Sequence, residues 1–305
     1  MSTNKNTTLI IVAFFSIYVI WGSTYLLNKI AVSELPPFKI AAIRFISAGL
    51  LILLIAKLLG LKLSISVKEL KNTMIAGFLF LTFGNGVAVW ALKYVDSGFA
   101  ALEISAQPLV ILVMMRILEG KKIKAMSIIG VILGIIGIYL LVGQEEILTG
   151  EHSLKGVIMI FACMLSWAYG SIFVSKAELP SNFFVNTAYQ MLTGGVMLFV
   201  CSLCLGEAWS VPSSWSQEVQ WSLVLLIIFG SIVAFTSFNY LLKIVSPEKV
   251  ATSTYVNPIV AMFLGWYFLD EAITSQSILA AAVLLTGVYF INTKREFAKI
   301  NKFKI

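Results

Sequence analysis

The sequence predicts an all-α integral membrane protein in which ten transmembrane helices form two inverted five-helix repeats around a central cavity. Of the 305 residues, 59% are hydrophobic and only 12% are charged, whereas about a quarter of the residues in soluble domains are charged. Apolar stretches of about 20 residues, the length that crosses a bilayer, recur from end to end. In addition, several residues of the first half recur in the second half at a constant shift along the sequence.

The ten expected spans follow these apolar stretches in order. They cover residues 8–28, 38–59, 70–92, 98–118, 124–143, 154–175, 183–205, 219–242, 249–269 and 275–293. The first stretch is longer than the apolar core of a signal peptide, so we expect it to be retained as a span. The cysteines, Cys163, Cys201 and Cys204, all fall within spans and are expected to be free thiols.

Basic residues predict how the chain crosses the membrane. The loops on the side of the N-terminus, together with both chain ends, contain most of them: Lys5, Lys57, Lys62, Lys68, Lys71, Arg116, Lys121, Lys122, Lys124, Lys176, Lys243, Lys249, Lys294, Arg295, Lys299, Lys302 and Lys304. The other side has Lys29, Lys39, Lys93 and Lys155. Because cytoplasmic loops are rich in Lys and Arg, we expect a multi-pass protein of the inner (cytoplasmic) membrane with both termini in the cytoplasm. We expect the basic tail, 294–305, to contact lipid and not nucleic acid.

An internal repeat relates the two halves. The segment ALKYVDSGFAALEISAQPLV (91–110) matches LLKIVSPEKVATSTYVNPIV (241–260) at a shift of 150 residues, which aligns Pro108 with Pro258. Earlier in each half, RFISAG (44–49) matches QMLTGG (190–195) at a shift of 146. We expect the repeats to cover 8–143 and 154–293. Because five spans are an odd number, the second copy enters the membrane from the opposite side, an arrangement typical of secondary transporters.

Several of these features occur together in one known family. Two tandem five-helix units, the sequence WGSTYL at 21–26, the RFISAG of the second span and the prolines of the fourth and ninth spans resemble the EamA-type branch of the drug/metabolite transporter superfamily. The resemblance covers nearly the whole chain. It implies that spans 1–4 and 6–9 line the cavity, that spans 5 and 10 lie outside it, and that the cargo is an amino acid, another metabolite or a drug, often exported.

Arg44 and Glu103 are charged residues inside expected spans. At helical rise, both lie about 8–9 Å below the outer surface. A lone charge near the bilayer centre costs about 2.5–3.5 kcal/mol, so we expect the two side chains to face each other or a wet cavity. Arg44 could bind a substrate carboxylate or phosphate, and Glu103 could bind an ammonium group or carry the coupling proton. Together they suit a zwitterion; the alternative is a structural ion pair. The resemblance implies that Arg44 recurs in the family, whereas Glu103 replaces a usually apolar residue.

Gln107 and Asn257 precede the two aligned prolines. A proline inside a helix frees a backbone carbonyl and bends the axis, so each amide can either satisfy freed backbone groups or contact a ligand. Glu103 with Gln107, and Ser253 with Asn257, are spaced i, i+4 and share a helix face. We therefore expect one polar stripe from each half to face the cavity. Gln190, which aligns with Arg44, is a further candidate.

Aromatic and amide residues of the first and third spans are the remaining binding candidates. Tyr18, Trp21 and Tyr25 share one face of the first span and could line the cavity, pack in the core or form an interfacial belt. Asn85 and Trp90 could contact substrate or join helices by hydrogen bonds.

Small residues predict close helix packing in the fifth and tenth spans. Gly130, Gly134 and Gly137 lie on one, and residues 280–282 and Gly287 on the other; such faces favour close contact, including a homodimer contact. The sequence contains no P-loop, no H-E-x-x-H and no Cys/His cluster, so we expect no cofactor, no metal and no enzymatic activity.

We therefore expect a permease that exports small molecules by alternating access. A membrane-embedded, lipid-modifying enzyme is an alternative that would need clustered Asp, His or metal ligands at one membrane face. A passive facilitator or channel is another, and flux measurements distinguish it from a carrier.

Overall fold

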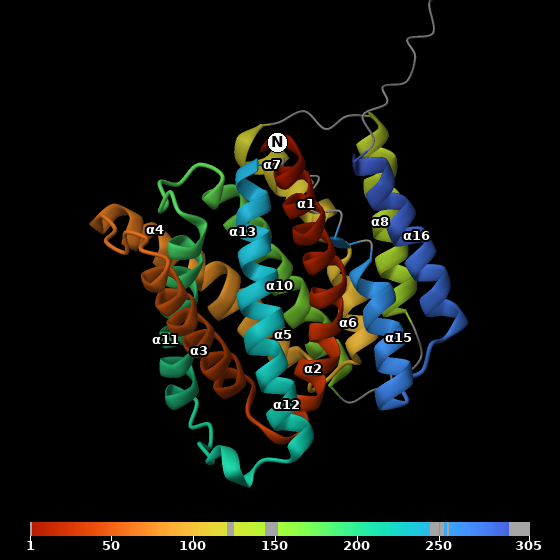
Figure 1. Ribbon diagram of the computed structural model, residues 1–305. Coiled ribbons are helices and arrows are strands. Elements are labelled where there is room, and N and C mark those ends of the chain that lie inside the picture. The colour runs from red at the N-terminus through yellow and green to blue at the C-terminus, as the bar shows by residue number, and fades with distance from the viewer. Residues whose placement is uncertain are drawn as a thin grey trace, which may run out of the picture.

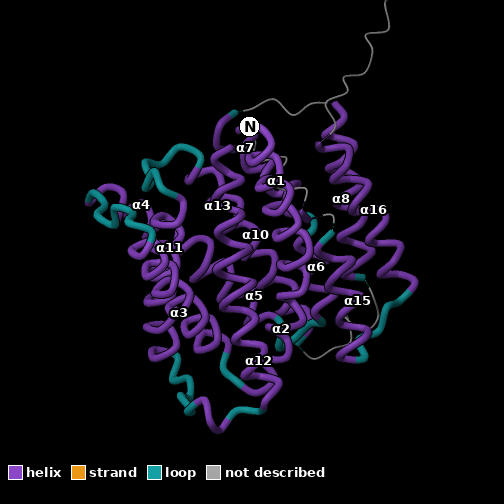
Figure 2. The backbone as a smooth tube through the Cα atoms, in the orientation of Figure 1, coloured by secondary structure: helices purple, strands orange, loops and turns teal. Residues whose placement is uncertain are grey.

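The chain folds as an all-α membrane protein. The computed structural model describes residues 2–120, 125–143, 152–244, 250, 253–254 and 256–292, and within these ranges every regular element is a helix (Figure 2). The predicted fold class is thereby confirmed. The basic tail and the lysines at 121, 122, 124 and 249 lie outside the described residues.

The first half provides the first five expected spans. These are α1 (Ser2–Phe15), η1 (Ser16–Ile20) and α2 (Trp21–Glu34); α3 (Pro37–Leu58); α4 (Val67–Gly77), η2 (Phe78–Asn85) and α5 (Gly86–Ala91); α6 (Ser97–Ile104) and α7 (Gln107–Glu119); and α8 (Ala125–Val142). Pro37 begins α3, where its missing N–H leaves no hydrogen bond unmade.

The second half repeats the pattern. Its helices are α10 (Ser153–Val174); α11 (Phe183–Cys204); α12 (Gln217–Leu225), η4 (Leu226–Val233) and α13 (Ala234–Ile244); α15 (Asn257–Leu269); and α16 (Ser275–Asn292), with the short helix η3 (Pro212–Ser214) in a loop. By length and composition, 7 helices are sufficient to cross a membrane, and Met126–Leu141, Asn257–Leu269 and Ser275–Gly287 are shorter apolar helices.

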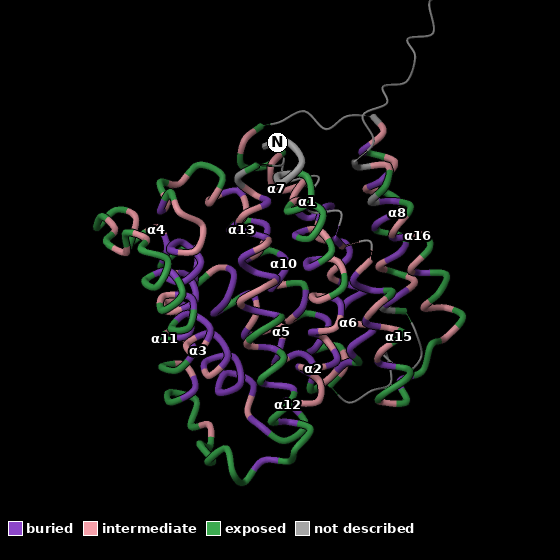
Figure 3. The backbone as a smooth tube through the Cα atoms, viewed as in Figure 1, coloured by how far each residue is buried: buried purple, intermediate pink, exposed green. Residues whose placement is uncertain are grey.

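Equivalent helices of the two halves pair with one another. α3 packs along α11, α6 along α15, and α8 along α16; α8 and α16 stand together at one edge of the bundle (Figure 1). Buried positions follow the interior and exposed positions follow the outward sides (Figure 3). Apolar side chains such as Leu50, Ile135 and Trp266 are exposed, as expected for surfaces that face lipid.

The small residues of α8 and α16 face each other within the chain. A Cβ atom added to Gly287 would lie 2.8 Å from the carbonyl oxygen of Gly130 and 2.9 Å from the backbone nitrogen of Gly134. On the other helix, a Cβ at Gly137 would lie 2.6 Å from Leu284 Cγ. The glycines therefore let the two backbones approach closely, and any homodimer through these helices has to use their other faces.

Three of the expected spans contain π-helical segments, which the sequence analysis did not predict. η1 interrupts the first span, and η2 and η4 occupy equivalent places in the third and eighth. π-Helical turns displace the regular backbone bonding and are frequent at functional sites. The fourth span is interrupted as well, because α6 ends at Ile104 and α7 begins at Gln107, next to Pro108.

Both described chain ends lie at the same end of the bundle. The start of α1 and the end of α16 mark this end, which we call the terminal face (Figure 1). The loops 35–36, 92–96, 205–216 and 270–274 lie at the other end, the opposite face.

Candidate functional site

A cavity of about 1430 Å³ runs through the centre of the bundle. Its wall contains residues of nearly every span in the described part of the chain, from both halves. α16 contributes no residue among its described side chains, and α8 contributes only Ser127. The arrangement agrees closely with the expectation that spans 5 and 10 lie outside the cavity.

The cavity reaches the surface at the terminal face and is closed toward the opposite face. Near the terminal face its wall includes Lys176 and Glu119, whose Nζ and Oε1 atoms form an ion pair at 2.5 Å. At the other end its wall consists of buried residues, including Asn28, Leu92 and Ala100. A small molecule could therefore enter from one side of the membrane and not from the other.

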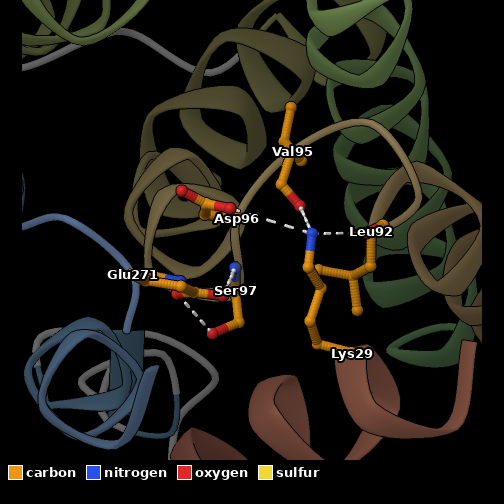
Figure 4. A network of polar contacts seen from close by, with 7 residues as sticks. Lys29, Leu92, Val95, Asp96, Ser97 and Glu271 are labelled. Atoms are coloured by element: carbon orange, nitrogen blue, oxygen red, sulfur yellow. Dashed lines mark hydrogen bonds and ion pairs between the residues drawn. The ribbon is translucent and has the colours of Figure 1, made fainter. Parts of the chain in front are cut away.

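A polar network lies beyond the closed end (Figure 4). Lys29 Nζ donates to the carbonyl oxygens of Leu92 (2.9 Å) and Val95 (2.7 Å) and lies 3.8 Å from Asp96 Oδ1. Glu271, from the second half, accepts hydrogen bonds from the backbone N–H groups of Ser97 (2.8 Å) and Gly98 (3.1 Å). A carboxylate at the N-terminus of α6 is stabilised by the helix dipole. Glu271 thus joins the second half to the first, whereas Lys29 joins α2 to the loop 92–96 within the first half.

Six of the ten predicted binding residues line the cavity and four do not. The wall includes Arg44, Gln107, Asn257, Trp21, Tyr25 and Asn85. It does not include Glu103, Gln190, Tyr18 or Trp90.

Arg44 projects from α3 to the second half of the chain. Its Nε donates to Ser231 Oγ in η4 at 2.7 Å, and its guanidinium carbon lies 4.8 Å from the centre of the Phe45 ring. The side chain is 3% exposed, and Nη1 is buried without a hydrogen-bond partner. Arg44 and Glu103 form no ion pair in this structure, so the predicted pairing between them is not observed.

Glu103 lies just behind the cavity wall. It is 2% exposed and its Oε2 has no hydrogen-bond partner. Its helix neighbours Ala100, Ile104 and Gln107 all line the cavity, so the carboxyl group lies on the face of the span that is turned toward the cavity. An ionised carboxylate in such a position is costly, and either a proton or a cation would remove that cost.

The two amides next to the prolines connect the halves at equivalent positions. Gln107 Nε2 donates to the carbonyl oxygen of Met164 in α10 at 3.0 Å. With its amide oriented to suit its surroundings, Asn257 Nδ2 donates to the carbonyl oxygens of Tyr18 (2.7 Å) and Ile17 (3.0 Å) in η1. Met164 follows Tyr18 by 146 residues, the same shift that aligns 44–49 with 190–195 in the repeat. Both amides thus bind backbone of the other half while lining the cavity.

The other candidates outside the wall have contacts typical of packing. Gln190 is fully buried and donates to Asn186 Oδ1 at 3.1 Å. The Tyr18 ring packs edge-on against Phe14. Trp90 packs against Phe38, and the ammonium group of Lys155 lies 5.2 Å from its ring centre.

Sequence reasoning missed most of the aromatic part of the wall. Trp21 and Trp167, related by the repeat, meet edge-on at 6.1 Å between ring centroids. The ring centroid of Phe238 lies 5.1 Å from that of Trp21 and 5.8 Å from that of Phe235. We call Trp21, Trp167, Phe235 and Phe238 the aromatic group. The alignment of Trp21 with Trp167 was the available signal; the two phenylalanines look like any apolar residue of a span.

Comparisons with known proteins agree with this architecture. The chain matches the EamA-like transporter family over residues 8–143 and 154–293. It is 35% identical over 280 residues to an Escherichia coli protein named uncharacterized inner membrane transporter YedA, covering 92% of this chain and 89% of the relative. It is 26% identical to a probable amino-acid metabolite efflux pump of Escherichia coli, covering 90% and 91%. A solved protein structure has the same fold, with a TM-score of 0.66 at 18% identity, covering 93% of this chain and 96% of that one.

Proposed function

Because the chain belongs to the EamA-like transporter family, we propose that it is a secondary transporter that exports small metabolites, such as amino acids or drugs, by alternating access. The observation that carries this proposal is the cavity, which is open at the terminal face and closed at the opposite face. Alternating access requires such a one-sided site between two inverted halves. The function involves no catalytic step and no cofactor.

The six lining candidates would contact the substrate, and Glu103 would carry the coupling proton. Arg44 supplies the positive charge, Gln107 and Asn257 supply amides from each half, and Trp21, Tyr25 and Asn85 supply the remaining surface. Glu103 suits proton coupling because its buried Oε2 has no partner that would compete for the proton.

The terminal face would lie in the cytoplasm. Lys57, Lys62, Lys68 and Lys176 belong to loops or helix ends at this end of the bundle, as the positive-inside rule requires for a cytoplasmic face. In this orientation a cavity open at the terminal face would load substrate from the cytoplasm, the step with which export begins. A homodimer would form through the outward faces of α8 and α16.

Flux into proteoliposomes tests the proposal. A carrier gives saturable uptake that is accelerated by the same substrate inside the liposome. The acceleration arises because the carrier then returns across the membrane with substrate bound. We expect such exchange for at least one member of a panel of amino acids, organic acids, polyamines and cationic drugs. Flux that rises linearly with concentration and shows no exchange would instead identify a channel.

A further inference from the structure

We propose that the cavity binds organic monocarboxylates that have a bulky, ring-bearing apolar body, and that Ser231 positions Arg44 to bind the carboxylate. This inference rests on the proposed transport function and specifies its substrate class. It replaces the zwitterion suggested by the sequence with a ligand that needs no amino group. Three observations lead to it, and they concern the free edge of Arg44, the aromatic group and the distribution of acidic residues.

The guanidinium of Arg44 has an unused hydrogen-bonding edge. Nε is held by Ser231 Oγ at 2.7 Å, whereas no hydrogen bond joins Nη1 or Nη2 to any described residue. Arg44 is almost completely buried and lines the cavity. A planar guanidinium fork binds a carboxylate through two parallel hydrogen bonds, and the fixed Nε leaves the remaining donors for such a ligand.

Ser231 fixes the direction in which this edge points. It is fully buried in η4, the π-helical segment of the eighth span. The neighbouring Gly230 leaves room for the guanidinium, because a Cβ there would lie 3.0 Å from Arg44 Nη2. The π-helical segment thus places one hydroxyl and one glycine against an arginine from the other half of the chain.

The aromatic group lies directly beside this charge. Trp21 Nε1 donates to the carbonyl oxygen of Gly230 at 3.3 Å, and Gly230 is also the residue that borders Arg44 Nη2. All four rings of the group line the cavity. Aromatic rings bury large apolar areas and favour edge-on or offset contacts with other rings, so a ring-bearing body fits next to a carboxylate held by Arg44.

The wall offers no comparable site for an ammonium group. Among the described residues, Glu119 is the acidic residue in the wall, and it forms an ion pair with Lys176 near the terminal face. Glu103 is not part of the wall. The charge of Arg44 therefore selects an anion, and among the described residues no carboxylate of the wall lies beside the aromatic group to bind a cation.

Four ligands with the same ring, together with the ringless carboxylate acetate, test this assignment by binding to the purified full-length protein in detergent. The series is 3-phenylpropionate, 3-phenylpropionamide, 2-phenylethylamine, phenylalanine and acetate, with calorimetric titration as the readout. We expect 3-phenylpropionate to bind about tenfold or more tightly than the amide, the amine and acetate, since tenfold corresponds to about 1.4 kcal/mol. We expect phenylalanine to bind no more tightly than 3-phenylpropionate.

Variants distinguish binding by Arg44 from a structural role. Arg44→Lys keeps the charge but lacks the fork, and should weaken 3-phenylpropionate binding about tenfold or more; Arg116→Lys, at the exposed end of α7, is the matched control. Ser231→Ala should weaken binding of the carboxylate and leave binding of the amide unchanged. A structural role would affect both ligands equally, and thermal unfolding confirms that each variant is folded.

Several results would overturn the assignment. These are equal binding of carboxylate and amide, tightest binding of the amine, phenylalanine binding tenfold more tightly than 3-phenylpropionate, or no binding by any of the five at millimolar concentration. Flux in proteoliposomes separates this proposal from the general one. Binding without flux would contradict transport and support the carboxylate site, whereas exchange of other compounds without a carboxylate preference would support transport and contradict the site.

Discussion

Arg44 and Glu103 place opposite charges in the interior without pairing with each other. Arg44 is stabilised by the hydroxyl of Ser231 and the ring of Phe45. Glu103 has an unpartnered Oε2. Buried charges are costly unless they are paired or neutralised, and charged residues within spans usually serve transport. For these two residues we therefore propose separate tasks, substrate binding for Arg44 and proton coupling for Glu103.

Replacing Glu103 with Gln should abolish the pH dependence of transport. The substitution keeps the shape of the side chain and removes its ability to gain and lose a proton. Exchange in proteoliposomes would be measured across a pH series for Glu103→Gln and for the control Glu218→Gln, which changes an exposed carboxylate of α12. If Glu103→Gln retained the full pH dependence, another group would carry the proton.

At the scale of elements, interrupted helices provide the polar contacts between the halves. The α6–α7 break presents Gln107 to α10, and the start of α15 presents Asn257 to η1. Asn257 finds its carbonyl acceptors in the π-helical segment η1, whereas Gln107 bonds Met164 within the continuous helix α10, because a helical carbonyl oxygen has a second lone pair. The break beside Pro108 and the start of α15 therefore supply the two amide donors at the centre of the molecule.

Gln107→Leu and Asn257→Leu should each lower the free energy of unfolding by about 0.6–2 kcal/mol, the usual range for a hydrogen bond between membrane helices. Because the two bonds occupy equivalent positions, their effects should be similar in size. Chemical or thermal unfolding in detergent measures this, with Gln217→Leu on exposed α12 as control. A loss for one amide only would show that the halves are not equivalent in this respect.

The pairing of α8 with α16 depends on glycine. Gly287→Ala would place a methyl group 2.8 Å from the backbone oxygen of Gly130, so the helices must move apart at a cost of about 1–3 kcal/mol. Ala282→Val, which adds bulk on the exposed side of α16, should leave the unfolding temperature nearly unchanged. Equal unfolding temperatures for Gly287→Ala and the unmodified protein would show that the contact between α8 and α16 can accept a methyl group.

At the scale of the whole molecule, the two ends of the bundle differ in how they are closed. The cavity reaches the surface beside Lys176 at the terminal face. At the opposite face the Lys29 and Glu271 contacts hold the loop 92–96 and the start of α6. We expect outward opening of the cavity to break these contacts, since they lie beyond its closed end.

Weakening this closure should expose the cavity to the outside. Asn28→Cys, in a background with Cys163, Cys201 and Cys204 changed to Ser, places a reporter at the closed end. We expect a membrane-impermeant thiol reagent to label it slowly from outside, and faster once Glu271→Ala removes the α6 cap. Glu218→Ala serves as control, and unchanged labelling with Glu271→Ala would exclude Glu271 from the closure.

The orientation of the molecule can be tested directly. Epitope tags at either terminus should become accessible to antibody only after the membrane is permeabilised, because the positive-inside rule predicts that the basic loops of the terminal face lie in the cytoplasm. A tag between Glu207 and Val211, in the loop at the opposite face, should be accessible on intact spheroplasts. The reverse pattern would place the cavity mouth outside and would contradict loading from the cytoplasm.

The membrane class, the spans and the relation between the halves could all be predicted from the sequence. The thickness of the bilayer sets the length of apolar sequence that a span needs. Hydropathy therefore predicts span positions well, and the expected span 38–59 agrees closely with α3. Pro108 marked the break between α6 and α7, and Pro258 marked the start of α15, since proline disfavours helical bonding to the preceding turn.

Which polar groups meet could not be predicted from the sequence and follows from how the helices pack. The partner of Arg44 is Ser231, 187 residues away, and Gln107 binds the backbone of a helix from the other half. Such contacts depend on the rotation and tilt of each helix. Spans that are apolar on every side carry little sequence information about rotation, so the distribution of Arg44 and Gln107 to the cavity wall, and of Glu103 to the layer behind it, follows from packing alone.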